Sequence, residues 1–181
     1  MIDRNATKLM YYANCGKHEA ERMVAVRLSM GRTMKKFLDN IKDNISGKSK
    51  VKMHFYSAHD SSVFPVLAML GLDVSEWPPF GADLIVELYE DVNKSHFIKV
   101  KYLGKPQIVR GCDKELCPLD QFLEALSPYQ IDDVEYKQLC RSNILEVIAK
   151  GLARRRRREM IEEAEDEDEE SKQRSDYAAG L

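Results

Sequence analysis

The sequence contains no long apolar run. A membrane-spanning helix needs about 20 consecutive, predominantly apolar residues, and polar or charged residues interrupt every hydrophobic stretch of this chain. The N-terminal residues also lack the continuous apolar stretch of a secretory signal peptide. Leu9, Met10 and Tyr12 already recur there at helical spacing, so we expect the chain to begin inside a larger architecture. No transmembrane segment is expected, and any targeting signal would lie upstream of Met1.

A large net charge of either sign is also missing. The 28 Lys and Arg residues nearly balance the 30 Asp and Glu residues, for a net charge of -2. Seven of the basic and ten of the acidic residues lie in 151–181, which leaves residues 1–150 close to neutral at +1. Proteins that bind nucleic acid electrostatically carry a basic excess. The composition therefore argues against a nucleic-acid partner.

Cysteine is scarce, and its spacing excludes the common zinc sites. The four cysteines are Cys15, Cys112, Cys117 and Cys140, and they form no Cys-x-x-Cys pair and no paired Cys/His spacing. We expect no metal site and no cofactor. Cys112 and Cys117 flank four residues. They form either a small disulfide loop, which would contribute about 2 kcal/mol, or two buried thiols in a reducing compartment.

The first half of the chain shows alternating helix and strand patterns. Apolar residues recur every three to four positions over 18–45, which predicts a long amphipathic helix. After a polar loop, the β-rich segment VKMHFYSA (51–58) predicts a buried strand. A helix is predicted over 61–72, with Ser61 or Ser62 as its N-cap.

The second half predicts a hairpin and two short helices. Residues 82–90 and 96–103 alternate polar and apolar side chains around a turn-like DVNKS, which indicates an antiparallel hairpin. Helices are predicted over 118–126 and 132–140. Helices combined with strands in this order indicate an α/β or α+β layer and not a helical bundle.

The C-terminal residues have a different composition. Five arginines at 154–158 precede nine acidic residues spread over 159–170. Such runs are usually solvated helix or disorder. An arginine-rich patch can also bind a polyanion, but the adjacent acidic run would neutralise this one. We interpret residues 146–181 as a charged tail, helical or disordered.

The junction SAHDSS (57–62) is the strongest candidate for chemistry. A predicted strand ends there, His59 and Asp60 follow, and a predicted helix begins. Ligands collect at the carboxyl ends of strands in open α/β sheets, and a helix N-terminus offers N–H groups and a positive dipole end to an anion such as phosphate. A histidine adds positive charge, and an aspartate can donate a proton. By themselves, however, Asp60 is more often a simple N-cap and His59 a hydrogen-bonded histidine at a sheet edge.

The motifs around this junction favour the functional interpretation of His59 and Asp60. The order of YSAHDSSV (56–63), WPPF (77–80), ADLIVELYE (82–90) and RGCDKELCPLDQFLEAL (110–126) resembles the histidine acid phosphatases, which form branch 2 of the histidine phosphatase superfamily. Within that family the spacing is most similar to the lysophosphatidic acid phosphatases. The resemblance covers roughly residues 50–140.

The resemblance implies a fold and roles for particular residues. It implies an α/β domain over 1–145 that is the C-terminal part of a histidine-phosphatase-like sheet, flanked by helices and carrying an antiparallel edge hairpin. Asp60 would be the proton donor to the leaving group, and His59 would bind the phosphate. Cys112 and Cys117 would form a disulfide, and Cys140 matches a cysteine that bridges to a helical subdomain in relatives; a pairing with Cys15 is left open.

One family motif is missing. The family's nucleophile is the histidine of an Arg-His-Gly motif, which these 181 residues do not contain. The other histidines are His18, His54 and His96, and none has a neighbouring arginine clamp. A phosphohistidine intermediate would therefore form only in a complete protein that supplies this segment.

Two functions of different class follow. The first is an acid phosphatase that hydrolyses small phosphomonoesters, with lysophosphatidic acid, a lysophospholipid, as the implied substrate. The second is a catalytically inactive truncated isoform or fragment that acts as a binding module. The resemblance implies a mitochondrial location or a secretory or lysosomal lumen, and the oligomeric state stays open. In-frame coding sequence for Arg-His-Gly upstream of Met1 would favour the first.

Overall fold

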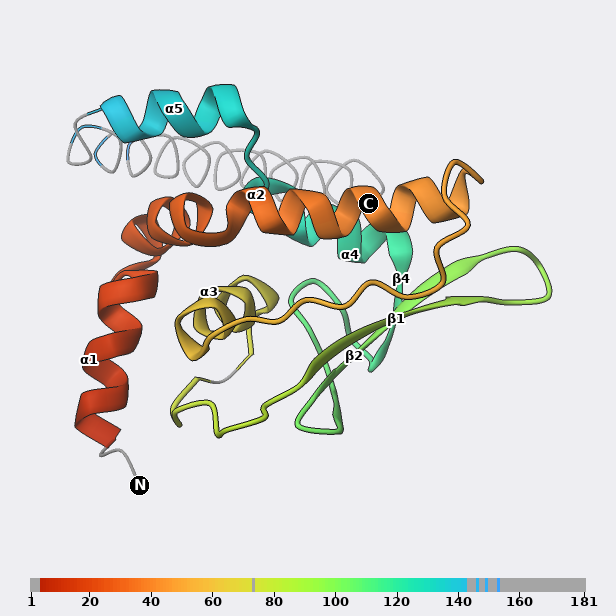
Figure 1. Ribbon diagram of the computed structural model, residues 1–181, viewed down its shortest axis with the longest axis horizontal. Coiled ribbons are helices and arrows are strands. Elements are labelled where there is room, and N and C mark those ends of the chain that lie inside the picture. The colour runs from red at the N-terminus through yellow and green to blue at the C-terminus, as the bar shows by residue number, and fades with distance from the viewer. Residues whose placement is uncertain (1–3, 73, 143–145, 147–148, 150–152, 154–181) are drawn as a thin grey trace, which may run out of the picture. The chain divides into compact units, whose positions relative to one another are not determined.

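Two helices form from the N-terminal part of the chain, as its helical periodicity predicts (Figure 1). The computed structural model describes residues 4–72 and 74–142, together with residues 146, 149 and 153. Helix α1 spans Arg4–Cys15 and helix α2 spans Glu19–Ile45. Between them the Glu21 carboxylate accepts hydrogen bonds from the backbone N–H groups of Lys17 and His18, at 3.1 and 3.3 Å. These bonds, the largest cause, lower the pKa of Glu21.

Helix α3 spans Asp60–Leu70 and packs beneath α2 (Figure 1). Every residue from 64 to 70 is buried, so α3 is an interior helix and not an amphipathic surface one. Gly71 closes it in a left-handed conformation with φ of 73°. The predicted helix is confirmed, but its N-cap is His59 and not Ser61 or Ser62, which places Asp60 in the first turn.

The sheet is antiparallel and is organised around one central strand. Strands β1 (Leu84–Glu90) and β2 (His96–Tyr102) form the predicted hairpin. Asp91 holds its turn by accepting hydrogen bonds from two backbone N–H groups at 2.8 Å each. The other edge of β2 pairs with β3 (Lys105–Gln107) and β4 (Leu116–Pro118).

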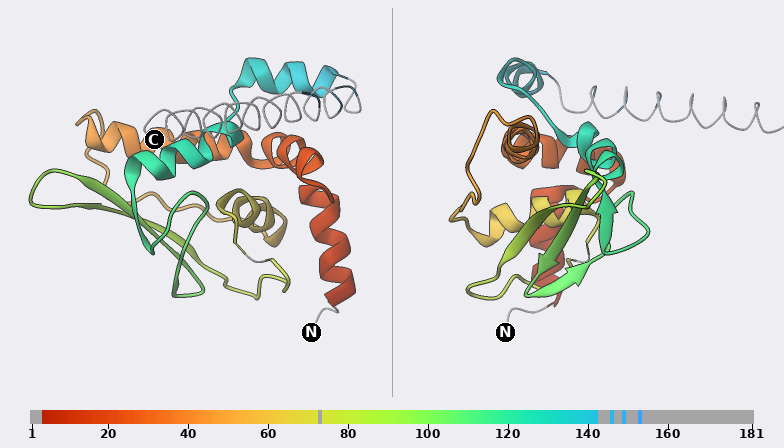
Figure 2. Two further views of the ribbon diagram at one scale, coloured as in Figure 1. Left: turned by 180° about the vertical axis from the view of Figure 1, so that it is seen from behind. Right: turned by 90° about the vertical axis from the view of Figure 1, so that its right-hand side faces the viewer.

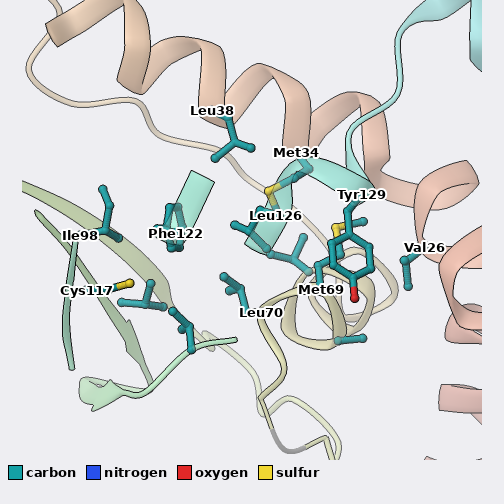
Figure 3. Packing of buried hydrophobic residues seen from close by; sticks show 14 of the residues in the cluster. Val26, Met34, Leu38, Met69, Leu70, Ile98, Cys117, Phe122, Leu126 and Tyr129 are labelled. Carbon is teal, nitrogen blue, oxygen red and sulfur yellow. The ribbon is translucent and has the colours of Figure 1, made fainter. Parts of the chain in front are cut away.

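Three short helical elements follow the sheet: α4 (Leu119–Leu126), the 3-10 turn η1 (Ser127–Tyr129) and α5 (Asp133–Arg141). Helix α4 packs on β2 and β4, and it lies next to the sheet in both views of Figure 2. The turn η1 packs on α2. The core lies between α2, α3, α4 and β2. Its buried side chains include Val26, Met34, Leu38, Met69, Leu70, Ile98, Phe122, Leu126 and Tyr129 (Figure 3). The fold class predicted from the sequence, helices layered with an antiparallel hairpin sheet, is confirmed.

The predicted strand over 51–58 is wrong. These residues are exposed and form no ladder with β1–β4; Figure 1 shows the segment running from the end of α2 back to α3. The alternation of a strand is retained, because His54 and Tyr56 stack on one side while Met53 and Phe55 are 77% and 82% exposed. The reason is that a strand needs a hydrogen-bonded neighbour, and local sequence specifies extended backbone but not that neighbour.

Cys112 and Cys117 form a disulfide, with their Cα atoms 5.5 Å apart, as the resemblance implies. Cys15 is a buried free thiol and Cys140 an exposed one, so they do not pair with each other. In the part of the chain that the structure describes, no helix has the length and apolar character to cross a bilayer. The charged tail predicted over 146–181 lies almost wholly outside the described residues, and the division at residue 145 stays a prediction.

Candidate active site

His59 and Asp60 lie where the extended segment 51–58 meets α3. His59 has extended backbone, with φ of -106° and ψ of 165°, and its carbonyl accepts hydrogen bonds from the N–H groups of Ser62 and Val63 at 2.9 and 3.0 Å. The chain therefore turns from extended to helical between these two residues. Both side chains are exposed to solvent, so a ligand in solution can reach them.

The Asp60 carboxylate accepts two hydrogen bonds, one on each oxygen. Its Oδ1 accepts from the backbone N–H of Ser61 at 2.7 Å, and its Oδ2 accepts from the indole Nε1–H of Trp77 at 2.9 Å. The first bond is local, since it lies within the first helical turn. The second comes from a loop 17 residues away. Together they hold the plane of the carboxylate even though the side chain is exposed.

Trp77 is also anchored by an aromatic contact with the same helix, four residues along from Asp60. Its ring meets the ring of Phe64 edge-on, with 5.2 Å between centroids and 87° between planes. Phe64 is fully buried and also meets Tyr11 of α1 edge-on at 6.3 Å. The next residue of the loop, Pro78, is buried as well. The indole ring is thus seated against the core while its N–H faces the carboxylate.

The contact between Trp77 and Asp60 could not be predicted from the sequence. Trp77 belongs to the WPPF motif, but nothing in the sequence indicates that the indole would lie beside Asp60. The available signal was that this is the single tryptophan of the chain, placed in a rigid loop next to a helix that carries the candidate site.

Phe80 occupies the exposed corner of the same loop. The Ala82 N–H donates to the Pro79 carbonyl at 3.1 Å, which closes a four-residue turn. Gly81 has φ of 70°, the left-handed conformation that the third position of such a turn requires. Phe80 is fully exposed as a result. An aromatic ring in water, three residues along from Trp77, is available to an apolar part of a ligand.

The remaining histidines lie on other elements. His18 precedes α2 as its N-cap, and His54 stacks on Tyr56 with 6.5 Å between ring centroids. His96 begins β2 and its Nε2 lies 3.3 Å from a carboxylate oxygen of Glu90. The pKa of Glu90 is lowered mainly by its hydrogen bond with Lys94 and to a lesser degree by His96. His59 is thus the histidine that adjoins Asp60 in the chain.

The site brings together an acid and a cation-forming side chain at a helix N-terminus. The positive end of the α3 dipole and a protonated His59 both favour an anion there. One of the first N–H groups, that of Ser61, is already engaged by Asp60. Among the described side chains of His, Cys, Asp and Glu, no three come together as metal ligands would. The chemistry available here is proton transfer and anion binding.

Comparison with known proteins identifies one family that agrees with the resemblance described above. The family model of the histidine phosphatase superfamily (branch 2) matches residues 5–103. That range includes His59, Asp60 and Trp77, and it extends toward the N-terminus beyond the motifs that carry the resemblance. The disulfide lies after it.

Three relatives illustrate the similarity. Lysophosphatidic acid phosphatase type 6 from Pongo abelii is 41% identical over 108 residues, which cover 58% of this chain and 25% of the relative. The protein of the same name from Mus musculus is 42% identical over 98 residues, covering 53% and 23%. Counting factor 60 from Dictyostelium discoideum is 33% identical over 119 residues, covering 66% and 28%. The chain spans about a quarter of the length of these relatives.

Proposed function

The chain belongs to branch 2 of the histidine phosphatase superfamily, and we propose that it forms part of a phosphomonoesterase in which Asp60 is the general acid and His59 binds phosphate. The observation that carries the proposal is the Asp60 carboxylate. It is exposed, lies in the first turn of a helix, and is held in place by two N–H donors.

The reaction needs two proton movements, and a single carboxyl can perform both. In the first step a histidine nucleophile from the Arg-His-Gly segment, which is not among these 181 residues, forms an N–P bond while the P–O bond to the alcohol breaks. Asp60 gives its proton to the departing oxygen. In the second step the Asp60 carboxylate takes a proton from water, whose oxygen forms a bond to phosphorus while the N–P bond breaks, so that inorganic phosphate and the free histidine are released.

The proton donor matters most when the leaving group is an alkoxide. An alkyl alcohol is a very weak acid, so its anion departs slowly unless it is protonated as the P–O bond breaks. Lysophosphatidic acid has such a leaving group, and the relatives from Pongo abelii and Mus musculus carry that substrate in their names. The exposed ring of Phe80 is suited to contact an acyl chain. We therefore propose lysophosphatidic acid as the substrate.

A chimaera tests the proposal directly. Residues 5–103 of this chain would replace the matching segment of a lysophosphatidic acid phosphatase type 6, which supplies the rest of the protein. We expect turnover of lysophosphatidic acid and of 4-nitrophenyl phosphate at mildly acidic pH. Asp60→Asn should lower kcat for the alkyl ester by about 10²–10⁴-fold and for the nitrophenyl ester far less, because nitrophenolate leaves without a proton.

Two controls frame this experiment. His54→Asn alters an exposed histidine of the preceding segment and should leave both substrates unaffected. The 181-residue chain by itself should show no turnover, because general acid catalysis alone contributes at most about 10⁴-fold, whereas enzymes accelerate phosphate-monoester hydrolysis by up to ~10²¹-fold. A folded chimaera in which Asp60→Asn hydrolyses the alkyl ester normally would contradict the proposal.

One observation favours a second candidate, a non-catalytic binding module. The 181 residues contain no Arg-His-Gly motif, and the segment 51–58 presents exposed apolar side chains and backbone without a ladder. Such a segment can pair with an edge strand of another protein. If the 181-residue chain is translated as such in cells and binds a partner through 51–58, this function would replace the first.

A further inference from the structure

We propose that Trp77 is a positioning residue for Asp60: its indole N–H, held by the core behind it, sets the orientation of the carboxyl that exchanges the proton. The inference rests on the proposed function, because it assigns a role within that reaction. It concerns a residue that contacts neither phosphate nor leaving group and acts through Asp60. Its basis is the hydrogen bond from Nε1 to Oδ2 at 2.9 Å.

The two hydrogen bonds occupy some of the acceptor lone pairs of the Asp60 carboxylate and leave the others free. Each carboxylate oxygen has two lone pairs. The Ser61 N–H occupies one on Oδ1 and the Trp77 N–H occupies one on Oδ2. One lone pair on each oxygen remains, and a proton held there points in a direction that the two N–H donors determine. Without Trp77, the carboxyl would keep a single bond from its neighbouring residue and could rotate about it.

The indole can impose this orientation because it is itself immobilised. Its ring packs edge-on against Phe64, which is fully buried, and Phe64 packs in turn on Tyr11. Edge-to-face pairs have a preferred geometry, which limits rotation of both rings. Asp60, by contrast, is exposed and has no packing of its own. Supporting residues that are locked by packing are what hold a reactive group within the narrow range that catalysis needs.

The hydrogen-bonding requirement of the indole N–H also explains why it faces Asp60. A buried or half-buried tryptophan usually finds an acceptor for its single donor. A hydrogen bond to a charged acceptor is stronger than one between neutral groups. The ring therefore does two things at once: its apolar body closes the core beneath the loop, and its N–H faces the reactive carboxyl.

The single tryptophan makes the contact measurable without any phosphatase activity. In the 181-residue chain one indole ¹H–¹⁵N resonance arises from Trp77, and its chemical shift, followed as the pH is varied, should respond to the Asp60 carboxylate that it contacts. Other titratable side chains nearby in sequence or in the aromatic packing include His59, Asp73, Glu76 and Tyr11. The titration should disappear in Asp60→Asn and persist in His59→Asn and Glu76→Gln. A resonance that does not titrate, or that titrates unchanged in Asp60→Asn, would overturn the proposal.

Kinetics in the chimaera test the role itself. Trp77→Phe keeps a ring against Phe64 and removes the N–H; it should lower kcat for an alkyl phosphate by about 10-fold and leave KM unchanged. The loss should be smaller for 4-nitrophenyl phosphate and absent in an Asp60→Asn background. Trp77→Leu removes the same N–H and should show the same dependence on the leaving group, which loss of packing would not produce.

The outcomes separate the two proposals. Turnover that depends on Asp60 but is unaffected by Trp77→Phe would overturn the role of Trp77 alone. A chimaera without Asp60-dependent turnover would overturn the proposed function, and the role of Trp77 with it.

Discussion

The two free thiols of the described chain differ sharply in their surroundings. Cys15 ends α1 and is fully buried, whereas Cys140 is exposed on α5. Burial raises the pKa of Cys15 to about 11, although nearby Arg22 opposes the shift. At pH 8 only about one Cys15 thiol in a thousand is therefore ionised. Because the thiolate is the reactive form, Cys15 should react slowly.

We expect Ellman's reagent at pH 8 to modify one thiol of the native chain quickly. That thiol is Cys140, so Cys140→Ser should remove the fast phase and leave Cys15 to react only after urea is added. The disulfide cysteines should not react at all before reduction. Two fast equivalents in the native chain would contradict this assignment.

The His59–Asp60 dipeptide does not by itself fix the orientation of the Asp60 carboxylate. Asp60 and His59 are exposed, and neither is held by packing. What distinguishes Asp60 from an ordinary helix-capping aspartate is the second hydrogen bond, from Trp77. That bond turns a common local feature into a carboxyl of defined orientation.

At the scale of elements, α2 packs closely against the end of η1 and the residues that follow it. Gly31 of α2 is buried, and a Cβ placed there would lie 2.6 Å from the Ile131 Cγ2 atom and 2.7 Å from the Tyr129 carbonyl oxygen. A side chain can rotate away from such a contact, but a backbone oxygen cannot. The glycine therefore permits the approach of these two elements.

We expect Gly31→Ala to destabilise the fold. Overpacking of this kind costs about 1–3 kcal/mol, and the better helix propensity of alanine returns about 1 kcal/mol, so the net loss should reach up to about 2 kcal/mol. Urea unfolding followed by circular dichroism measures it. Lys36→Ala, on the exposed face of the same helix, is the matched control and should change stability by no more than about 0.5 kcal/mol. A Gly31→Ala chain as stable as wild type would show that residues 129–131 can move away.

The extended segment 51–58 is tied to α2 by one of its faces. The Tyr56 ring packs at a tilt against the Phe37 ring, with 4.7 Å between centroids and 57° between planes, and its hydroxyl accepts a hydrogen bond from Asn40 at 2.6 Å. The Val51 carbonyl accepts another from Asn44 at 3.0 Å. The opposite face carries Met53 and Phe55 and is left to solvent. The segment is thus anchored as an element without being part of the sheet.

For the molecule as a whole, this face is an apolar surface that is open to association between chains. Extended backbone without a ladder next to exposed apolar side chains favours pairing between chains. We expect the purified 181-residue chain to self-associate as its concentration rises. Met53→Thr with Phe55→Ser should reduce this, as measured by light scattering and analytical ultracentrifugation.

A control separates this surface from general exposure of apolar residues. Val92 lies at the tip of the hairpin and is 96% exposed, so Val92→Ser removes an apolar side chain elsewhere. It should leave self-association unchanged. Equal effects of the two variants would mean that 51–58 is not the contact.

Local sequence determined much of this protein. The periodicity over 18–45, the cap at Gly71 and the alternation on either side of DVNKS each depend on residues close together in the chain, and α2, α3 and the hairpin formed as predicted. The position of His59 and Asp60 at the start of a helix was also predictable, because the end of an extended run and the start of a helix are both local.

Tertiary structure alone decided the rest. Whether 51–58 becomes a strand depends on a hydrogen-bonded neighbour, which no property of those residues specifies. The pairing of β3 and β4 with one edge of β2 was missed because each is three residues long and contains a proline. Trp77 reaches Asp60 only because the loop after α3 folds back over Phe64. Contacts of this kind join residues distant in sequence, so they are determined by packing of the whole core and not by any pattern within one segment.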